Sequence, residues 1–211
     1  MKKLEIKPII TTILLIAFQS VLFLGTKLLQ GTPHLLGGPI DEKIPFNIWF
    51  IIPYCIWYVL IFAVPYFLYK KNKDSFVRYI YSYIICTVVA NIIFVIYPST
   101  VARPEVASTN IITFVTHFIF WIDTPILNCF PSLHCAMSML FITYMFENKN
   151  IKPIIKIVIT IISILIMAST LFIKQHVFID FVSGDILALI VYFLVKKSYK
   201  ENNLIKKLLK I

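Results

Sequence analysis

Residues 153–195 read PIIKIVITIISILIMASTLFIKQHVFIDFVSGDILALIVYFLV, two long apolar runs separated by Lys174, Gln175 and His176. Each run approaches the length of about 20 residues that an α-helix needs to cross a bilayer. A connection this short makes successive helices antiparallel neighbours. The pattern therefore predicts two adjacent membrane-spanning helices, with polar side chains at the rim where they meet.

The same apolar pattern extends over the rest of the chain. Its 211 residues are 59% hydrophobic and 14% charged, with a mean hydropathy of +0.87. A soluble domain of this length has too little interior to bury so many apolar residues. We predict an all-α, polytopic protein with a single integral membrane domain over residues 1–211 and a motif-bearing core at about 97–195. Six spans are expected: Pro8–Leu28, Ile48–Tyr69, Tyr79–Tyr97, Ser132–Phe146, Pro153–Ile173 and His176–Val195.

Two apolar segments need a separate interpretation. The first predicted span follows Lys2, Lys3 and Lys7 and resembles a signal peptide in that respect. Its apolar stretch is long and no small-residue cleavage site follows, which favours a span. Between the third and fourth spans, Ile111–Ile122 is apolar but too short to cross, which predicts a re-entrant or interfacial helix.

Basic residues are distributed unevenly between the two sides of the predicted bundle. All but four of the twenty Lys and Arg residues lie at the chain ends or in loops that follow even-numbered spans. The positive-inside rule then predicts that both termini lie in the cytoplasm. We expect the protein in the cell membrane. Anchoring to anionic lipids explains the net charge of +10, so no nucleic-acid partner is expected. The four exceptions are Lys27, Lys43, Arg103 and Lys174.

Three polar clusters fall at the predicted outer ends of the helices: Arg103-Pro104, then Pro131-Ser132-Leu133-His134, then Ser169, Lys174-Gln175-His176 and Asp180. Ionisable groups at such places are costly, which indicates a functional site. His176 and Asp180 are four residues apart and therefore share one helix face. The carboxylate can hold the proton on one ring nitrogen and leave the other free to attack. The alternative is a purely structural polar pair.

Arg103 and the second cluster have features of a phosphate site. Arg is rare in this Lys-rich chain, and a guanidinium can grip a phosphate through two bonds; an interfacial Arg beside a lipid headgroup is the alternative. Proline suits a helix start and Ser132 is a good N-cap. Free N–H groups there favour an anion, and His134 would stand in the first turn. A capped helix with an incidental histidine is the other interpretation.

These residues resemble the motifs of the type 2 phosphatidic acid phosphatase superfamily, which are Lys-x6-Arg-Pro, Pro-Ser-x-His and Ser-Arg-x5-His-x3-Asp. Arg103-Pro104 matches the end of the first motif, residues 131–134 match the second, and Ser169, His176 and Asp180 match the third. The resemblance covers roughly residues 97–185 and extends to the six-helix layout. Ile96 replaces the family's lysine and Thr170 its second arginine, so Lys174 is a candidate replacement cation.

The resemblance implies a two-step phosphoryl transfer that needs no metal or other cofactor. His176 would attack phosphorus while Asp180 orients it, and His134 would protonate the leaving group and then activate water. The phosphoryl oxygens would be held by Arg103, Lys174, Ser132, Leu133 and Ser169.

The implied substrate is a membrane lipid phosphate or diphosphate at the outer face: phosphatidic acid, phosphatidylglycerol phosphate or a polyprenyl diphosphate. The motifs also resemble the inositol phosphorylceramide and sphingomyelin synthase branch, whose members pass a phospho-headgroup to a lipid alcohol. A lipid phosphotransferase is therefore the alternative function. A third interpretation is a non-catalytic transporter or scaffold with a decayed motif, although both histidines, Asp180 and Arg103 are retained.

Overall fold

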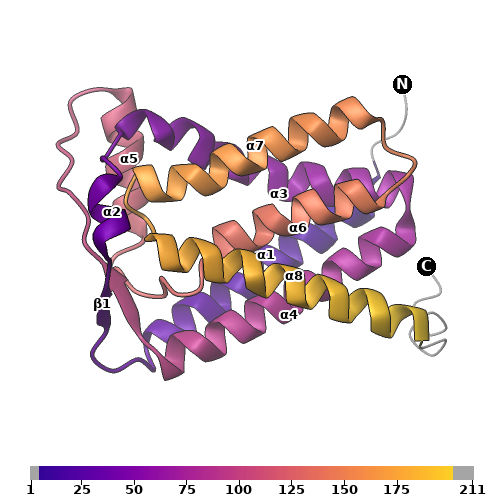
Figure 1. Ribbon diagram of the computed structural model, residues 1–211, viewed down its shortest axis with the longest axis horizontal. Helices are drawn as coiled ribbons and strands as arrows, with labels where there is room; N and C mark the ends of the chain where they lie inside the picture. The colour runs from indigo at the N-terminus through magenta and orange to yellow at the C-terminus, as the bar shows by residue number, and fades with distance from the viewer. Residues whose placement is uncertain (1–4, 202–211) are drawn as a thin grey trace.

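The computed structural model describes residues 5–201 and shows long helices lying side by side (Figure 1). The long helices are α1 (Ile6–Lys27), α3 (Ile51–Lys71), α4 (Lys73–Ile96), α6 (Leu133–Glu147), α7 (Pro153–Phe172) and α8 (Phe178–Glu201). The shorter elements are β1 (His34–Leu36), α2 (Pro39–Lys43), the 3-10 helix η1 (Ile48–Phe50), β2 (Ser99–Val101) and α5 (Ile111–Ile122).

The helices make this a multi-pass membrane protein, as the composition predicts. Among the described residues, five helices are long and apolar enough to cross a membrane: Ile6–Lys27, Ile48–Lys71, Lys73–Ile96, Pro153–Phe172 and Phe178–Tyr199. Helix α6 has 15 residues and falls short of that length, so the count of six spans stays a prediction. Helix α5 forms where a short helix is expected, and its re-entrant or interfacial position also stays a prediction.

The short helix α6 lies inside the bundle. It contacts α3, α4, α7 and α8, and the side chains of Met137, Leu140 and Phe141 are fully buried. By contrast, α1 and α7 expose large apolar side chains such as Leu14 and Ile161, as lipid-facing helices do. Because protein surrounds α6, its short apolar length is compatible with a position in the middle of the bundle.

The connecting segments β1, α2 and α5 gather at one end of the bundle, on the left in Figure 1. Strands β1 and β2 pair in parallel over three residues, a small addition to the all-α fold that the sequence predicts. Lys174 Nζ donates to the carbonyl oxygens of Asp41 (3.0 Å) and Ile44 (2.5 Å), and Phe178 N–H donates to Asp41 Oδ1 (2.7 Å). These bonds fasten α2 over the α7–α8 turn.

Basic residues mark the opposite end of the bundle. The α3–α4 turn carries Lys70, Lys71 and Lys73, and Lys149 and Lys152 stand between α6 and α7. Further residues of the charge pattern, Lys2, Lys3, Lys206, Lys207 and Lys210, lie outside the described residues. The assignment of this end to the cytoplasm remains a prediction.

Candidate active site

Backbone contacts bring the second and third motifs together. Ser132 N–H donates to the carbonyl oxygen of Asp180 at 3.1 Å, and Ser183 Oγ donates to the same oxygen at 3.0 Å. Gly184 permits this approach, because a Cβ at this position would lie 2.3 Å from the Ser132 carbonyl oxygen and 3.2 Å from Ala136 N. The start of α6 is thereby held against the first turns of α8.

We expect Gly184→Ala to destabilise the protein by about 1–3 kcal/mol, because the added methyl must push two backbones apart. Thermal unfolding in detergent measures this effect. Gly25→Ala in α1 is the matched control, since a Cβ there meets nothing within 4 Å and alanine is the better helix former. An equal Tm for the Gly184 variant and the wild type would contradict the assigned contact.

The Asp180 side chain caps the first turn of α8 and also contacts His176. Its Oδ2 accepts a hydrogen bond from Val177 N–H at 3.2 Å, in the way that an acidic side chain caps the first turn of a helix. The same oxygen lies 3.3 Å from His176 Nδ1, and Asp180 is fully buried. Because a carboxylate only accepts hydrogen bonds, this contact favours the tautomer with the proton on Nδ1. The other ring nitrogen, Nε2, then keeps its lone pair.

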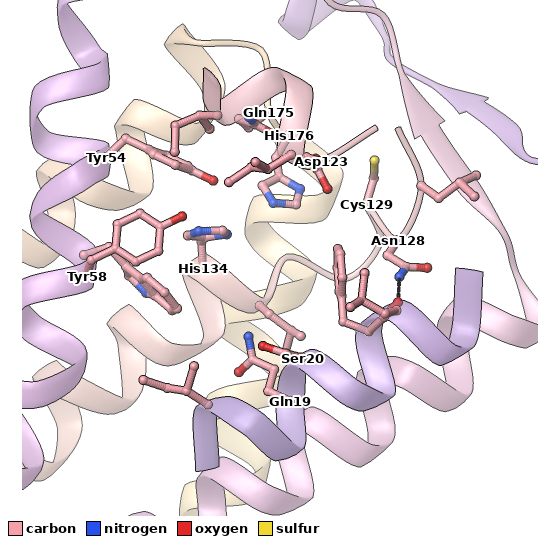
Figure 2. Close-up of a pocket in the computed structure, with 18 of the residues that line it drawn as sticks. Gln19, Ser20, Tyr54, Tyr58, Asp123, Asn128, Cys129, His134, Gln175 and His176 are labelled. Carbon is pink, nitrogen blue, oxygen red and sulfur yellow. Dashed lines mark hydrogen bonds between the residues drawn. The ribbon is translucent and has the colours of Figure 1, made fainter. Parts of the chain in front are cut away.

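His134 stands beside His176 at the start of α6. The two ring centroids are 6.0 Å apart, and Figure 2 shows both rings near the centre of one pocket. Tyr54 and Trp57 of α3 pack against the His134 ring, with centroid distances of 4.8 Å and 4.6 Å. Its Nε2 is buried without a hydrogen-bond partner among the described residues. A buried polar atom left unpaired is costly, which indicates a ligand at this position.

Arg103 provides the cation of the site. Its side chain is 4% exposed, and Nη2 donates to Asp123 Oδ2 at 2.6 Å. The guanidinium lies 5.3 Å from the centre of the Phe120 ring, which helps to fix its plane. Its Nε and Nη1 are buried and have no partner within the described part of the chain. Two unused donors of a planar guanidinium suit the oxygens of one phosphate.

Two cavities share Arg103 and His176 in their lining. The inner cavity has a volume of about 300 Å³ and is lined by both histidines, Arg103, Asp123 and mainly apolar side chains of α1, α3 and α5. The outer cavity, of about 570 Å³, lies between the β1–α2 segment and the α7–α8 turn, and Lys174 lines it. An anion held between Arg103 and His176 would therefore be reached from both cavities.

The other residues that the sequence assigns to phosphate binding differ in their position relative to the two cavities. Ser169 is fully buried in α7 and donates to the carbonyl oxygen of Ile166 at 2.5 Å, outside the lining of either cavity. Ser132 also lines neither cavity, and its Oγ caps α6 by accepting from Cys135 N–H at 3.3 Å. Leu133 lines the inner cavity. Lys174 faces the outer cavity with two of its donors already bound to carbonyls.

The two positions that depart from the family motifs do not present side chains to the site. Ile96 ends α4 with 77% of its surface exposed. Thr170 is fully buried, and its Oγ1 donates to the carbonyl oxygen of Met167 at 2.7 Å. The Thr170 carbonyl accepts from Gln175 N–H and His176 N–H, so this residue shapes the turn that carries His176.

Other side chains of the site carry no motif in the sequence. Tyr54 and Trp57 are two of 32 aromatic residues, and nothing in their spacing marks them. Gln175 adjoins His176 and lines the inner cavity. Lys27 and Asp123, which pair at 3.2 Å, are ionisable residues in or next to apolar segments, and that signal could have singled them out.

The arrangement offers a nucleophilic nitrogen, a second imidazole and a guanidinium around one space. These groups suit the transfer of a phosphoryl group to His176. Within residues 5–201, no three His, Cys, Asp or Glu side chains are grouped so that they could hold a metal ion.

One comparison with known proteins identifies a family. The family model described as the PAP2 superfamily matches residues 19–194, well over half of the chain. The matched region contains all three motifs, and with them His134 and His176. No match was found among curated proteins or among solved structures.

Proposed function

The chain belongs to the PAP2 superfamily, and from this membership we propose that it is a metal-independent phosphatase of a membrane lipid phosphate or diphosphate. One observation carries the proposal. His176, with its tautomer set by Asp180, shares a largely apolar cavity with His134 and with a buried Arg103 that has unused donors.

In the first step, His176 Nε2 attacks phosphorus and the bond to the lipid oxygen breaks. Asp180 stabilises the positive charge that develops on the imidazole. Arg103 holds the non-bridging oxygens, and N–H groups at the start of α6, near Leu133, add donors that a helix start leaves free. His134 gives a proton to the departing oxygen.

In the second step, water cleaves the phosphohistidine, and His134 takes a proton from that water as it attacks phosphorus. The phosphate then separates from His176 Nε2. Both cavities are lined by His176 and Arg103, which supports a single phosphate position for the two steps. A lipid tail would occupy the apolar inner cavity, and water would enter and phosphate leave through the outer cavity.

The substrates proposed are phosphatidic acid, phosphatidylglycerol phosphate and polyprenyl diphosphate. They share a terminal phosphate on an apolar tail, and the mainly apolar lining of the inner cavity supports this choice. We propose that the site faces the extracytoplasmic side of the cell membrane, because it lies at the bundle end away from the Lys-rich α3–α4 turn.

Phosphate release from these lipids by the purified protein in detergent, with EDTA present, tests the function. We expect release that persists in EDTA. No release from any of the lipids would contradict the phosphatase proposal.

We expect Arg103→Lys to lower kcat/KM by about one to two orders of magnitude, because an ammonium cannot reproduce the two-donor face of a guanidinium. Steady-state kinetics on the preferred lipid measures this. The matched control is Arg78→Lys, since Arg78 pairs with Glu147 away from both cavities. Equal losses in both variants would argue against a phosphate contact by Arg103.

A lipid phosphotransferase is the second candidate. The observation that favours it is the size of the outer cavity, about 570 Å³, which exceeds the space that a water molecule needs. Headgroup transfer to labelled diacylglycerol or ceramide, in the absence of phosphate release, would replace the first proposal by this one.

A further inference from the structure

Lys27 and Asp123, which belong to none of the three motifs, form one charged cluster with Arg103. Lys27 Nζ lies 3.2 Å from Asp123 Oδ1, and Arg103 Nη2 lies 2.6 Å from Asp123 Oδ2. One carboxylate therefore joins two cations, one at the end of α1 and the other just after β2. The side chains are 8% exposed for Lys27, 22% for Asp123 and 4% for Arg103. Asp123 lines the inner cavity together with both histidines.

The two cations differ in what they have left to offer a ligand. Lys27 Nζ donates to Asp123 Oδ1, to the Asp123 carbonyl oxygen at 3.1 Å and to the Pro125 carbonyl oxygen at 2.8 Å. An ammonium has three donors, so all of them are used. Arg103 Nε and Nη1 have no partner among residues 5–201. Lys27 thus binds Asp123 and its loop, whereas Arg103 still has N–H donors that can bind a phosphate.

The balance of charges suggests that Lys27 neutralises Asp123. Asp123 places a negative charge on the wall of the inner cavity, where an anionic group would bind, and next to Arg103. Without a counter-charge, this carboxylate would offset Arg103 and repel a phosphate, and such effects are strong where water is scarce. With Lys27 bound to it, Asp123 can hold the guanidinium in place while the charge of Arg103 remains available.

We propose that Lys27 and Asp123 are positioning residues that together orient Arg103 and keep its charge available for the substrate phosphate. This inference rests on the proposed function. Lys27 comes from α1 and is bound to the carboxylate that pairs with Arg103, in a chain whose first motif has Ile96 in place of lysine.

A double-mutant cycle on anion binding tests the inference without relying on turnover. Binding of orthovanadate, a mimic of the phosphoryl group, is measured by calorimetry for the wild type, Lys27→Met, Asp123→Asn and the double variant in detergent. We expect Lys27→Met to weaken binding about tenfold or more. In the Asp123→Asn background, Lys27→Met should lower the affinity for orthovanadate by less than about threefold, because no carboxylate is left to neutralise.

Three further variants separate positioning from a structural role. Lys27→Arg keeps the charge and should bind orthovanadate nearly as the wild type does. Lys70→Met removes a cation that pairs with Glu5 at the other end of the bundle, and should leave binding unchanged. Lys27→Gln keeps a donor for the two carbonyls and repeats the comparison if the methionine variant does not fold.

Equal weakening by Lys27→Met in both backgrounds, or no orthovanadate binding by the wild type, would overturn the inference. Phosphate release by the wild type is recorded in parallel. If the wild type releases phosphate but the effects of the two substitutions on orthovanadate binding are additive, the positioning role is rejected and the phosphatase proposal stands. A coupled cycle without release would support the positioning role and reject the phosphatase.

Discussion

Replacement of His176 by asparagine is expected to lower phosphate release by about four orders of magnitude, since it removes the only nucleophile that the mechanism provides. The side-chain amide of asparagine can take the place of Nδ1 and donate to Asp180, which lies 3.3 Å from Nδ1 in the wild type. The variant therefore keeps the buried carboxylate paired while it loses Nε2.

A covalent intermediate gives the second readout for this variant. Incubation with a lipid that carries labelled phosphate should leave acid-labile label on the wild-type protein and none on His176→Asn. Tm in detergent should change little, because the Asp180 contact is kept. Residual release above about one percent of wild type, with normal folding, would place the nucleophile elsewhere.

Replacement of His134 by glutamine is expected to lower release from an alkyl lipid phosphate by about three orders of magnitude. The alkoxide then departs without a proton, and water attacks the phosphohistidine without a base. The effect should depend on the leaving group, which distinguishes His134 from His176. Para-nitrophenyl phosphate, whose leaving group needs no protonation, should still phosphorylate the His134 variant.

The His134 variant should therefore give a burst of nitrophenol equal to the enzyme present, followed by slow turnover and accumulated phosphohistidine. His176→Asn should give neither burst nor label with the same reagent. A His134 variant that turns over alkyl and nitrophenyl substrates with equal losses, and without a burst, would contradict its assignment as acid and base.

Some of the predicted contacts are present in the structure because they depend on residues close together in the chain. His176 and Asp180 are four positions apart, a spacing that predicts neighbouring side chains. The structure places His176 Nδ1 3.3 Å from Asp180 Oδ2, with His176 in the turn that precedes α8. Ser132 before an apolar helix indicates a cap, and it caps α6. The short apolar run Ile111–Ile122 forms a helix, α5.

Other features depend on packing between distant segments and have no local signal. The parallel pairing of β1 with β2 joins residues more than sixty positions apart. Ser169 has the spacing of a phosphate ligand, yet helix α7 turns its hydroxyl to its own backbone. Lys174 stays a candidate replacement for the missing cation, and only the fold shows that it also bonds to the carbonyl oxygens of Asp41 and Ile44.

The composition and the apolar periodicity are enough to identify a helical membrane protein, and the motifs are enough to identify its family. Both signals depend on hydropathy and spacing within single helices or short segments. The tertiary structure decided which of the candidate residues share a cavity. The contact at Gly184 sets His134 beside His176, and the end of α1 brings Lys27 to Asp123 and Arg103. These contacts arise from helices packing against one another, and sequence separation along the chain does not encode that distance in space.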